Sequence, residues 1–414
     1  IYKMSSNMTG PLSKKRIVLG VTGSIACYKS IDLASKFKQA GAEVDVILTE
    51  SATKFVTPLS FKSITHRQVV TDLFDLDSEL AINHVFLAEQ ADIFVIAPAS
   101  ANTIAKLANG LSDNPLLTSV LATKAPIVVA PAMDADMFEN AATQRNVATL
   151  MSDGVFIAGP AEGRLASGLV GLGRMVEPYD LIGVTEMVLG RNGDFSGKRI
   201  VVSAGGTQEP IDPVRTIGNR SSGKMGYAIA EAARNRGAIV TIVSAPTALP
   251  DLVGVRTIKV ESALDMQEAL STECNDAHSI IMAAAVADWR PVRTLKSKAK
   301  KSNAETWKID LTKNPDIIAG IQSSRSNESD NLVKVGFAAE SENLIENGSA
   351  KVSKKGLDFI VANDITAQDS GFSVDTNKVT IIHADGTIEK LPLMSKYEVG
   401  NAILDRVKPG LSSK

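Results

Sequence analysis

The apolar residues of the chain fall into short runs, and the first of these runs predict a βαβ unit. Residues 16–21 form a nearly continuous apolar run, residues 22–25 form a polar turn, and a helical period of apolar residues then extends to Ala40. A second apolar run follows at residues 43–48. A strand, a helix and a second strand in this order are typical of a parallel βαβ unit.

The later apolar runs repeat this pattern and indicate parallel sheets that are buried on both faces. In the first half, the runs at residues 93–97 and 127–130 are short and are followed by proline-containing loops. In the second half, the pattern restarts with a strand at residues 198–203, a long loop, a helix over residues 226–236 and a strand at residues 239–243. Further strands are predicted at residues 280–284, 333–337, 359–362 and 379–382. We therefore predict two doubly wound, Rossmann-like α/β domains with parallel sheets.

A polar segment with three glycines, residues 190–197, separates the two halves and is typical of a linker. We place the first domain at residues 14–189 and the second at residues 198–414. A chain of 414 residues exceeds the size of one ordinary core, which agrees with at least two domains. The residues before Lys14 contain no apolar signal core and are interpreted as a leader, with a candidate start at Met4.

Composition limits the partners and the compartment. The chain is 44% hydrophobic and 22% charged, as expected of a globular protein. Its net charge of -2 offers no broad basic surface, so we expect binding neither to nucleic acid nor to a membrane. No apolar run approaches the roughly 20 residues that span a bilayer. Two cysteines cannot form a disulfide framework, and we predict a cytoplasmic protein.

Two short polar motifs in the first half follow predicted strands. Gly23-Ser-Ile lies between a strand and a helix and offers backbone N–H groups to a phosphate, but it lacks the Gly-x-Gly-x-x-Gly spacing of dinucleotide sites. Residues 98–103 follow the third strand, at the edge of the sheet where α/β proteins bind ligands. The hydroxyl and amide groups there could bind a phosphate and a ring. Alternatively, Ser100 only caps a helix.

These motifs and three others together resemble the FMN-dependent phosphopantothenoylcysteine decarboxylases. The matching segments are residues 23–25, His84, residues 98–103, residues 131–133 and residues 165–178. The resemblance implies a flavodoxin-like domain in which residues 165–175 form a clamp over the substrate. The implied FMN-binding residues are Gly23, Ser24, Ile25, Ser100, Asn102 and Thr103; the implied catalytic residues are His84 and Ser167, and the implied substrate-binding residues are Asp134, Arg174 and Met175.

The implied reaction is oxidation of the substrate's cysteinyl group by bound flavin, loss of carbon dioxide, and reduction of the resulting enethiol. His84 could act as a general base or stabilise charge, because imidazole titrates near neutral pH. Two residues depart from the family pattern: the clamp usually carries cysteine at the position of Ser167, and asparagine usually stands at the position of Asp134. A hydroxyl is a far weaker acid than a thiol. Either another group supplies the final proton, or the reaction stops at the enethiol.

The second half carries a long polar loop and several motifs further along the chain. The loop, residues 203–226, is rich in glycine, and loops of this length are usually functional. A dinucleotide-binding turn would be shorter, so NAD is disfavoured. Further motifs lie at residues 283–289, 298–301, 314–317, 336–340 and 351–358. In this order they resemble the phosphopantothenate–cysteine ligase module over residues 198–405.

Activation of a carboxylate by a nucleoside triphosphate needs cations around the phosphates. The resemblance implies CTP as the nucleotide, with Mg²⁺ at Asp288. The implied CTP-binding residues are Asp288, Lys298, Asn314, Pro315, Asp316, Ile317, Phe337, Lys351 and Lys355; the implied substrate-binding residues are Arg215 and Ala285, and the implied catalytic residues are Asn219 and Lys298. The amide of Asn219 could donate to the oxyanion of the acyl-cytidylate. Taken alone, residues 296–301 are typical of a solvated loop, and Trp289 and Trp307 are interpreted as packing residues.

We therefore predict a bifunctional enzyme of coenzyme A biosynthesis that uses phosphopantothenate, cysteine and CTP as substrates and FMN and Mg²⁺ as cofactors. The second domain ligates and the first decarboxylates. Two alternatives stay open: a flavin-binding regulatory module, and a flavoprotein that stops at the enethiol. The resemblance also implies a homo-oligomer, with trimeric contacts between decarboxylase modules and dimeric contacts between ligase modules, up to a dodecamer.

Overall fold

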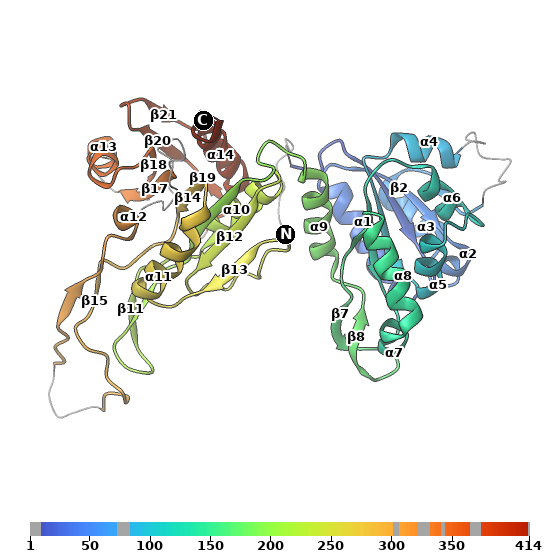
Figure 1. The fold of residues 1–414 in the computed structure, drawn as a ribbon, viewed down its shortest axis with the longest axis horizontal. Helices are drawn as coiled ribbons and strands as arrows, with labels where there is room; N and C mark the ends of the chain where they lie inside the picture. Colours follow the sequence, from blue (N-terminus) through green and yellow to red (C-terminus); the bar gives the residue numbers. More distant parts are fainter. Residues whose placement is uncertain are drawn as a thin grey trace. The chain divides into compact units, whose positions relative to one another are not determined.

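The computed structural model of the protein describes residues 10–72, 83–300, 306–321, 332–340, 344–364 and 374–412. The chain divides into two compact units, Ile1–Gly190 and Arg191–Lys414, which run from blue to green and from green to red in Figure 1. Within the described ranges, no helix combines the length and the apolar character that a bilayer crossing needs.

The first unit is built on a six-stranded parallel sheet with the order β3-β2-β1-β4-β5-β6. Its strands are β1 (Arg16–Val21), β2 (Glu43–Leu48), β3 (Val69–Val70), β4 (Ile93–Ala99), β5 (Ile127–Pro131) and β6 (Phe156–Ile157). This is the Rossmann order, so the predicted doubly wound class is confirmed. The order reverses between β1 and β4, and ligands of such sheets bind at the carboxyl ends of the strands beside that point.

Helices of the first unit pack in groups, α1 against α3 and α9, α4 against α6, and α5 against α8. They are α1 (Cys27–Gln39), α2 (Glu50–Thr53), α3 (Pro58–Thr65), α4 (Asn83–Gln90), α5 (Ala101–Ala108), α6 (Pro115–Ala122), α7 (Ala135–Glu139), α8 (Ala141–Ser152) and α9 (Pro178–Gly190). The helix that follows β1, α1, buries Leu33, Ala34 and Phe37 along one stripe. Its start lies directly after the β1 turn that the sequence identified.

A hairpin of the first unit lies outside the sheet. Its strands are β7 (Ala161–Arg164) and β8 (Val170–Arg174), and the connecting turn is exposed. The backbone N–H of Met133 donates to the carbonyl oxygen of Gly173 (3.0 Å). A Cβ at Gly173 would lie 2.3 Å from the Met133 carbonyl oxygen, so this close approach requires glycine. The hairpin is thus held against the loop that follows β5.

The second unit contains an eight-stranded sheet with the order β13-β12-β9-β14-β17-β18-β20-β21. Its strands are β9 (Arg199–Ala204), β12 (Ile239–Ser244), β13 (Arg256–Lys259), β14 (Ser279–Met282), β17 (Val333–Glu340), β18 (Phe359–Asp364), β20 (Val379–His383) and β21 (Ile388–Lys390). The prediction of a parallel sheet was wrong at one edge, because β20 is antiparallel to both β18 and β21. The connection from β20 to β21 is a short turn with Gly386 at a φ of 86°, and a short turn can only join antiparallel strands.

Helices and three small ribbons complete the second unit. The helices are α10 (Lys224–Arg234), α11 (Ala263–Glu273), a 3₁₀ turn (Cys274–Asp276), α12 (Ile317–Gly320), α13 (Leu344–Lys355) and α14 (Lys396–Ser412). The antiparallel ribbons pair β10 (Gln208–Pro210) with β11 (Thr216–Gly218), β15 (Trp289–Pro291) with β16 (Leu311–Lys313), and β19 (Thr376–Asn377) with β22 (Met394–Ser395). Figure 1 shows the β15 ribbon extending away from the sheet of its unit.

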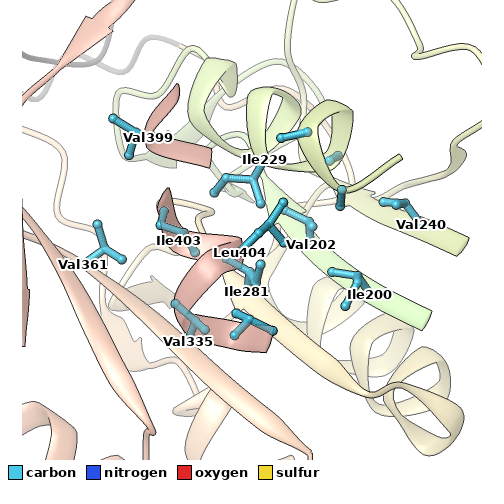
Figure 2. Packing of buried hydrophobic residues seen from close by; sticks show 14 of the residues in the cluster. Ile200, Val202, Ile229, Val240, Ile281, Val335, Val361, Val399, Ile403 and Leu404 are labelled. Carbon is cyan, nitrogen blue, oxygen red and sulfur yellow. The ribbon is translucent and has the colours of Figure 1, made fainter. Parts of the chain in front are cut away.

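The core of the second unit joins the middle of the sheet to α10 and α14. Ile229 of α10 and Ile403 and Leu404 of α14 are fully buried. Figure 2 shows them gathered beside Val202 and Ile281, which point from β9 and β14. Two helices far apart in sequence therefore close one face of this sheet.

Part of the predicted linker belongs to this second unit. Phe195 is 0% exposed, and the Arg236 guanidinium lies over its ring with Cζ 4.7 Å from the ring centre. Asp194 accepts hydrogen bonds from Arg236 Nε (3.0 Å) and Nη2 (2.7 Å), and Lys408 Nζ lies 3.0 Å away. The hydrogen bonds from Arg236 lower the pKa of the Asp194 carboxyl to about 2. The contacts of residues 194 and 195 therefore anchor this segment rather than leave it free.

Candidate functional sites

The turn between β1 and α1 presents backbone donors at a helix N-terminus. Within the described part of the chain, the N–H groups of Ser24 and Ile25 have no acceptor, and the Ile25 side chain is exposed. The Ser24 hydroxyl accepts from the N–H of Ala26 (3.3 Å). A Cβ at Gly23 would lie 2.5 Å from Ser51 Cβ, so glycine is required at this position. Open N–H groups at the positive end of a helix favour an anion.

The β4–α5 turn lies beside the β1–α1 turn because Thr22 joins the two strand ends. The Thr22 hydroxyl donates to the carbonyl oxygen of Pro98 (2.9 Å) and accepts from the N–H of Ser100 (2.9 Å). The Ser100 hydroxyl caps α5 by accepting from the N–H of Thr103 (3.3 Å), and the two hydroxyls lie 3.1 Å apart. Asn102 is exposed. The helix-cap interpretation of Ser100 is therefore confirmed, and the cap leaves its hydroxyl on the ligand edge of the sheet.

The two residues that depart from the family pattern contact each other. The Ser167 hydroxyl donates to Asp134 Oδ2 at 2.5 Å, while Asp134 Oδ1 caps α7 by accepting from the N–H of Asp136 (3.3 Å). Ser167 is exposed in the turn of the β7–β8 hairpin. The hydroxyl proton of Ser167 is therefore engaged by the Asp134 carboxylate. This contact weakens the prediction that Ser167 protonates the substrate.

Of the remaining predicted residues of the first unit, Met175 is buried, Arg174 is exposed, and the side chain of His84 lies outside the described residues. Met175 is 1% exposed, and its carbonyl oxygen accepts from Lys29 Nζ (2.9 Å), so only its backbone is engaged. Arg174 Nη2 donates to Glu177 (3.2 Å). His84 is the second residue of α4, and its side chain lies outside the described residues.

The second unit contains a cavity of about 810 Å³ at the carboxyl ends of its strands. Ten of the residues predicted for this unit line it: Asn219, Ala285, Asp288, Asn314, Pro315, Asp316, Ile317, Phe337, Lys351 and Lys355. They come from the α10 loop, the β14 loop, the start of α12, β17 and α13. The Rossmann topology collects these distant segments because parallel strands end at one edge of the sheet.

Hydrogen bonds order the polar side chains of this cavity. Asn219 Nδ2 donates to the carbonyl oxygen of Val286 (3.0 Å), and Asn314 Nδ2 donates to that of Ala287 (2.8 Å). Lys355 Nζ lies 3.0 Å from Asp316 Oδ2, so these two predicted residues form an ion pair. Asp288 is exposed. The amide of Asn219 retains a second N–H for a ligand, because one N–H is used by Val286.

Several cations of the cavity were missed by the sequence reasoning: Lys224, Lys313, Lys354 and Lys396. Lys224 Nζ lies 2.7 Å from Asp375 Oδ1. Lys396 is 6% exposed and donates to the carbonyl oxygen of Val374. Burial and the nearby charge of Lys224 lower the pKa of Lys396. Lys224 and Lys396 are the first residues of α10 and α14, and no local pattern indicates that two helix starts 172 positions apart face one cavity.

Arg215 and Lys298 do not line this cavity. Arg215 donates to Asp212 (3.0 Å), and its guanidinium lies over the ring of Trp307. Lys298 is exposed in the loop that follows β15. Arg215 and Lys298 therefore lie outside the cavity that the other ten predicted residues of the same chain line.

Comparison with known proteins assigns both units. Residues 5–190 match the family Flavoprotein, and residues 195–411 match the DNA/pantothenate metabolism flavoprotein C-terminal domain. "Coenzyme A biosynthesis bifunctional protein CoaBC" of Vibrio vulnificus (strain CMCP6) is 42% identical over 398 residues, which cover 96% of this chain and 98% of that protein. The chain belongs to the CoaBC family. It is thus a bifunctional enzyme of coenzyme A biosynthesis, as predicted.

Other members of the CoaBC family agree in length and identity. The Bacillus subtilis (strain 168) protein is 41% identical over 399 residues, which cover 96% of this chain and 97% of that protein. Among solved structures, the C-terminal domain of a coenzyme A biosynthesis bifunctional protein CoaBC is 39% identical and covers 54% of this chain and 100% of that one, with a TM-score of 0.45.

The residues of this CoaBC member fit a mononucleotide flavin better than a metal bound by protein alone. The β1–α1 turn offers one cluster of open N–H groups, which suits one phosphate. The described residues contain no group of three or more His, Cys, Asp or Glu that could hold a metal ion. Mg²⁺ usually binds one or two carboxylates together with substrate phosphates, and Asp288 offers such a carboxylate at the cavity.

Proposed function

We propose that the second unit joins phosphopantothenate to cysteine with CTP, through an acyl-cytidylate, and that the first unit decarboxylates the product with FMN. The observation that carries the ligase half is the cavity of about 810 Å³, which is large enough for a nucleotide and is lined by lysines from three helices. Lys224, Lys351 and Lys396 come from α10, α13 and α14. Cations from several directions are what the transfer of a nucleotidyl group requires.

In this proposal, each polar group of the cavity has a distinct task. Lys351 and Lys355 neutralise phosphate oxygens, and Asp288 holds Mg²⁺ against them. The second N–H of the Asn219 amide donates to the oxyanion that forms when the cysteine amine attacks the acyl-cytidylate. Phe337 and residues 314–317 enclose the base. The products of the first step are the acyl-cytidylate and pyrophosphate, and the products of the second are the amide and CMP.

The first unit would hold the FMN phosphate at the open N–H groups of Ser24 and Ile25, with Ser100 and Thr103 beside it. Bound flavin supplies the oxidation and the later reduction of the cysteinyl group. The protein orients the substrate under the β7–β8 hairpin and excludes water there. His84 is proposed to hold or move the proton of the substrate thiol, since imidazole titrates near neutral pH.

Lys298 has to reach the nucleotide from outside the cavity of its own chain. A pair of ligase units offers a direct route, because the loop of one copy can extend into the cavity of the other. We therefore retain the proposal of a homo-oligomer with dimeric ligase contacts and trimeric flavoprotein contacts. We also retain a cytoplasmic location, for which two free, buried cysteines are the supporting observation.

The contact between Ser167 and Asp134 argues against Ser167 as the acid of the last step. A hydroxyl that donates to a carboxylate at 2.5 Å is not free to protonate a substrate, so a clamp without another acid would stop at the enethiol. A regulatory role without catalysis receives less support, because the ligase cavity is complete apart from Lys298 and Arg215.

The decisive experiment is mass analysis of the products that purified full-length protein forms from phosphopantothenate, cysteine, CTP, Mg²⁺ and FMN. We expect pyrophosphate, CMP, carbon dioxide and phosphopantetheine. Absence of both phosphopantothenoylcysteine and phosphopantetheine would overturn the ligase half. Accumulation of the undecarboxylated amide would overturn the flavoprotein half.

An Asn219→Asp variant tests the order of the ligase steps. A carboxylate repels the developing oxyanion, so we expect pyrophosphate release to continue while product formation slows. Equal slowing of both would place Asn219 in substrate binding.

A further inference from the structure

A buried carboxylate joins two loops of the second unit. Asp212 follows β10, and its side chain is 0% exposed. Its Oδ1 accepts from the N–H groups of Val214 (2.8 Å) and Arg215 (2.9 Å), within its own turn. Its Oδ2 accepts from Arg215 Nη1 (3.0 Å) and from the N–H of Ala299 (3.1 Å). One carboxylate thus connects the turn after β10 to the residue that directly follows Lys298.

Further contacts hold both ends of the same loop. The N–H of Leu295 donates to the carbonyl oxygen of Ile211 (2.9 Å), and the Thr294 hydroxyl donates to that of Pro210 (3.1 Å). At the other end, both terminal nitrogens of Arg215 lie 3.4 Å from the Ala299 carbonyl oxygen. Between these ends, the Lys298 side chain is exposed.

Arg215 is a fixed part of this arrangement. Its guanidinium binds Asp212 and Ala299 and lies over the Trp307 ring, with Cζ 5.1 Å from the ring centre. These contacts engage one edge and one face of the guanidinium, while 37% of the side chain stays exposed. A planar guanidinium suits such a double contact, which lysine could not reproduce.

Burying a charge is costly unless its hydrogen bonds are satisfied. Burial raises the pKa of the Asp212 carboxyl, but the N–H groups of Val214, Ala299 and Arg215 lower it by more, so the carboxyl stays ionised at neutral pH. An ionised, enclosed carboxylate fixes the two loops in one relative arrangement, because any displacement of Ala299 would leave part of the charge unpaired.

We propose that Asp212 is a positioning residue of the ligase reaction: together with Arg215, it holds residues 294–299 so that the Lys298 ammonium is presented to the nucleotide phosphates. This inference rests on the proposed function of Lys298 in CTP binding. It gives Arg215 a contact with the Lys298 loop, and the expected contact between Arg215 and substrate stays a prediction.

The test uses Asp212→Asn in the full-length protein. The amide oxygen can still accept from Val214 and Arg215, but the amide NH₂ faces the N–H of Ala299 and the Arg215 guanidinium, donor against donor. We expect kcat/KM for CTP to fall by about 10- to 100-fold, the value of a charge-assisted hydrogen bond. Asp310→Asn is the matched control. It also replaces one aspartate by asparagine, but Asp310 is exposed and directly precedes β16. It should keep the activity of the unaltered protein.

A double variant separates positioning from general stability. If Asp212 acts through Lys298, Asp212→Asn added to Lys298→Gln should lower kcat/KM no further than Lys298→Gln alone. Independent losses that multiply would overturn the proposal. Trypsin should also cleave after Lys296 and Lys298 about tenfold faster in Asp212→Asn than in Asp310→Asn, and equal cleavage would overturn it as well.

The outcomes distinguish this inference from the proposed function. Normal turnover of Asp212→Asn beside an impaired Lys298→Gln would overturn the role of Asp212 alone. Normal turnover of Lys298→Gln would overturn the role of Lys298, and the present proposal with it. If Asp212→Asn fails to fold, Arg215→Lys provides the test, since it keeps the charge but loses the fork on Ala299 and should shift the same measurements in the same direction.

Discussion

The two units present their ligand groups in different ways. In the ligase unit, side chains from the starts of α10, α12 and α14 converge on one cavity. In the flavoprotein unit, the predicted polar side chains pair with one another: Ser100 with Thr103, and Ser167 with Asp134. In the described part of this unit, the backbone N–H groups of Ser24 and Ile25 have no acceptor. The proposed nucleotide site is thus built from charged side chains, whereas the proposed flavin site relies on the backbone of the turn between β1 and α1.

The largest effect is expected when the charge of Lys298 is removed, and it should be confined to the ligase reaction. Lys298→Gln should slow cytidylate formation by about 30- to 1,000-fold, because a charge-assisted contact in a transition state contributes about 2–4 kcal/mol. Flavin absorbance of the variant should not change, since the proposed flavin site lies in the first unit and Lys298 lies in the second. Pyrophosphate release and the visible spectrum measure the two effects on one sample.

Mixing two inactive variants tests whether the loop acts on a second copy. When Lys298→Gln and Asn219→Asp chains are mixed, half of the dimers are mixed dimers and one of their two cavities is complete, so about a quarter of the normal ligase activity should return. No recovery after verified exchange of chains would assign Lys298 to its own cavity.

The flavin site should respond to shape instead of charge. Gly23→Ala places a Cβ 2.5 Å from Ser51 Cβ, and relief of such a clash costs about 1–3 kcal/mol. We expect the Kd for FMN to rise by about 5- to 150-fold with ligase activity unchanged. Gly10→Ala serves as the control, because an added Cβ there meets no atom within 4 Å. Unchanged flavin affinity in Gly23→Ala would move the phosphate site away from this turn.

A smaller effect is expected at the clamp. Ser167→Cys weakens the contact with Asp134, because a thiol is a poor donor, yet it should alter the decarboxylation rate by less than about tenfold. The expected product of both proteins is phosphopantetheine, with water or another side chain as the acid. An unaltered protein whose product lacks two hydrogens relative to phosphopantetheine would contradict this, and Ser167→Cys would then restore the reduced product.

The smallest effect concerns the anchored start of the second unit. The pKa of Asp194, about 2, lies below the value of about 3.9 in an unfolded chain, so its contribution is present above pH 4 and is lost as the pH falls toward 2. After screening at this partly exposed site, Asp194→Asn should cost about 1 kcal/mol at pH 7 and almost nothing near pH 2. Both tryptophans, Trp289 and Trp307, lie in the second unit, so tryptophan fluorescence in urea reports its unfolding selectively. A pH-independent difference would show that packing of Asp194 matters more than its charge.

Buried strands could be predicted from the sequence because their signal is local. The predicted strand at residues 43–48 coincides with β2, and most others agree within two residues at their starts. Phe195 was assigned to a linker because it is a single apolar residue among glycines, although its contact with Arg236 lies 41 positions away. The tryptophans were interpreted as packing residues, but Trp289 and Trp307 are 45% and 50% exposed beneath Lys313 and Arg215. Contacts between segments that are distant in the sequence do not produce a periodic pattern of apolar residues, so the sequence does not predict them.

The candidate sites divide in the same way. Motifs that follow strands were located, since the topology carries strand ends to one edge. Lys396 was missed because it lies in no motif and reaches the cavity only through the packing of α14 on α10. The position of Lys298 depends on the enclosed Asp212, whose carboxylate looks like any other in the sequence.

The place of α14 in the core sets an order of events during synthesis. Val399, Ile403, Leu404 and Val407 are all 0% exposed and cover strands that were made up to two hundred residues earlier. The first unit also joins distant segments, since α1 packs against α9, but the last of its helices ends at Gly190. On the ribosome, the flavoprotein unit is therefore able to fold while the sheet of the ligase unit still exposes the apolar face that α14 will cover.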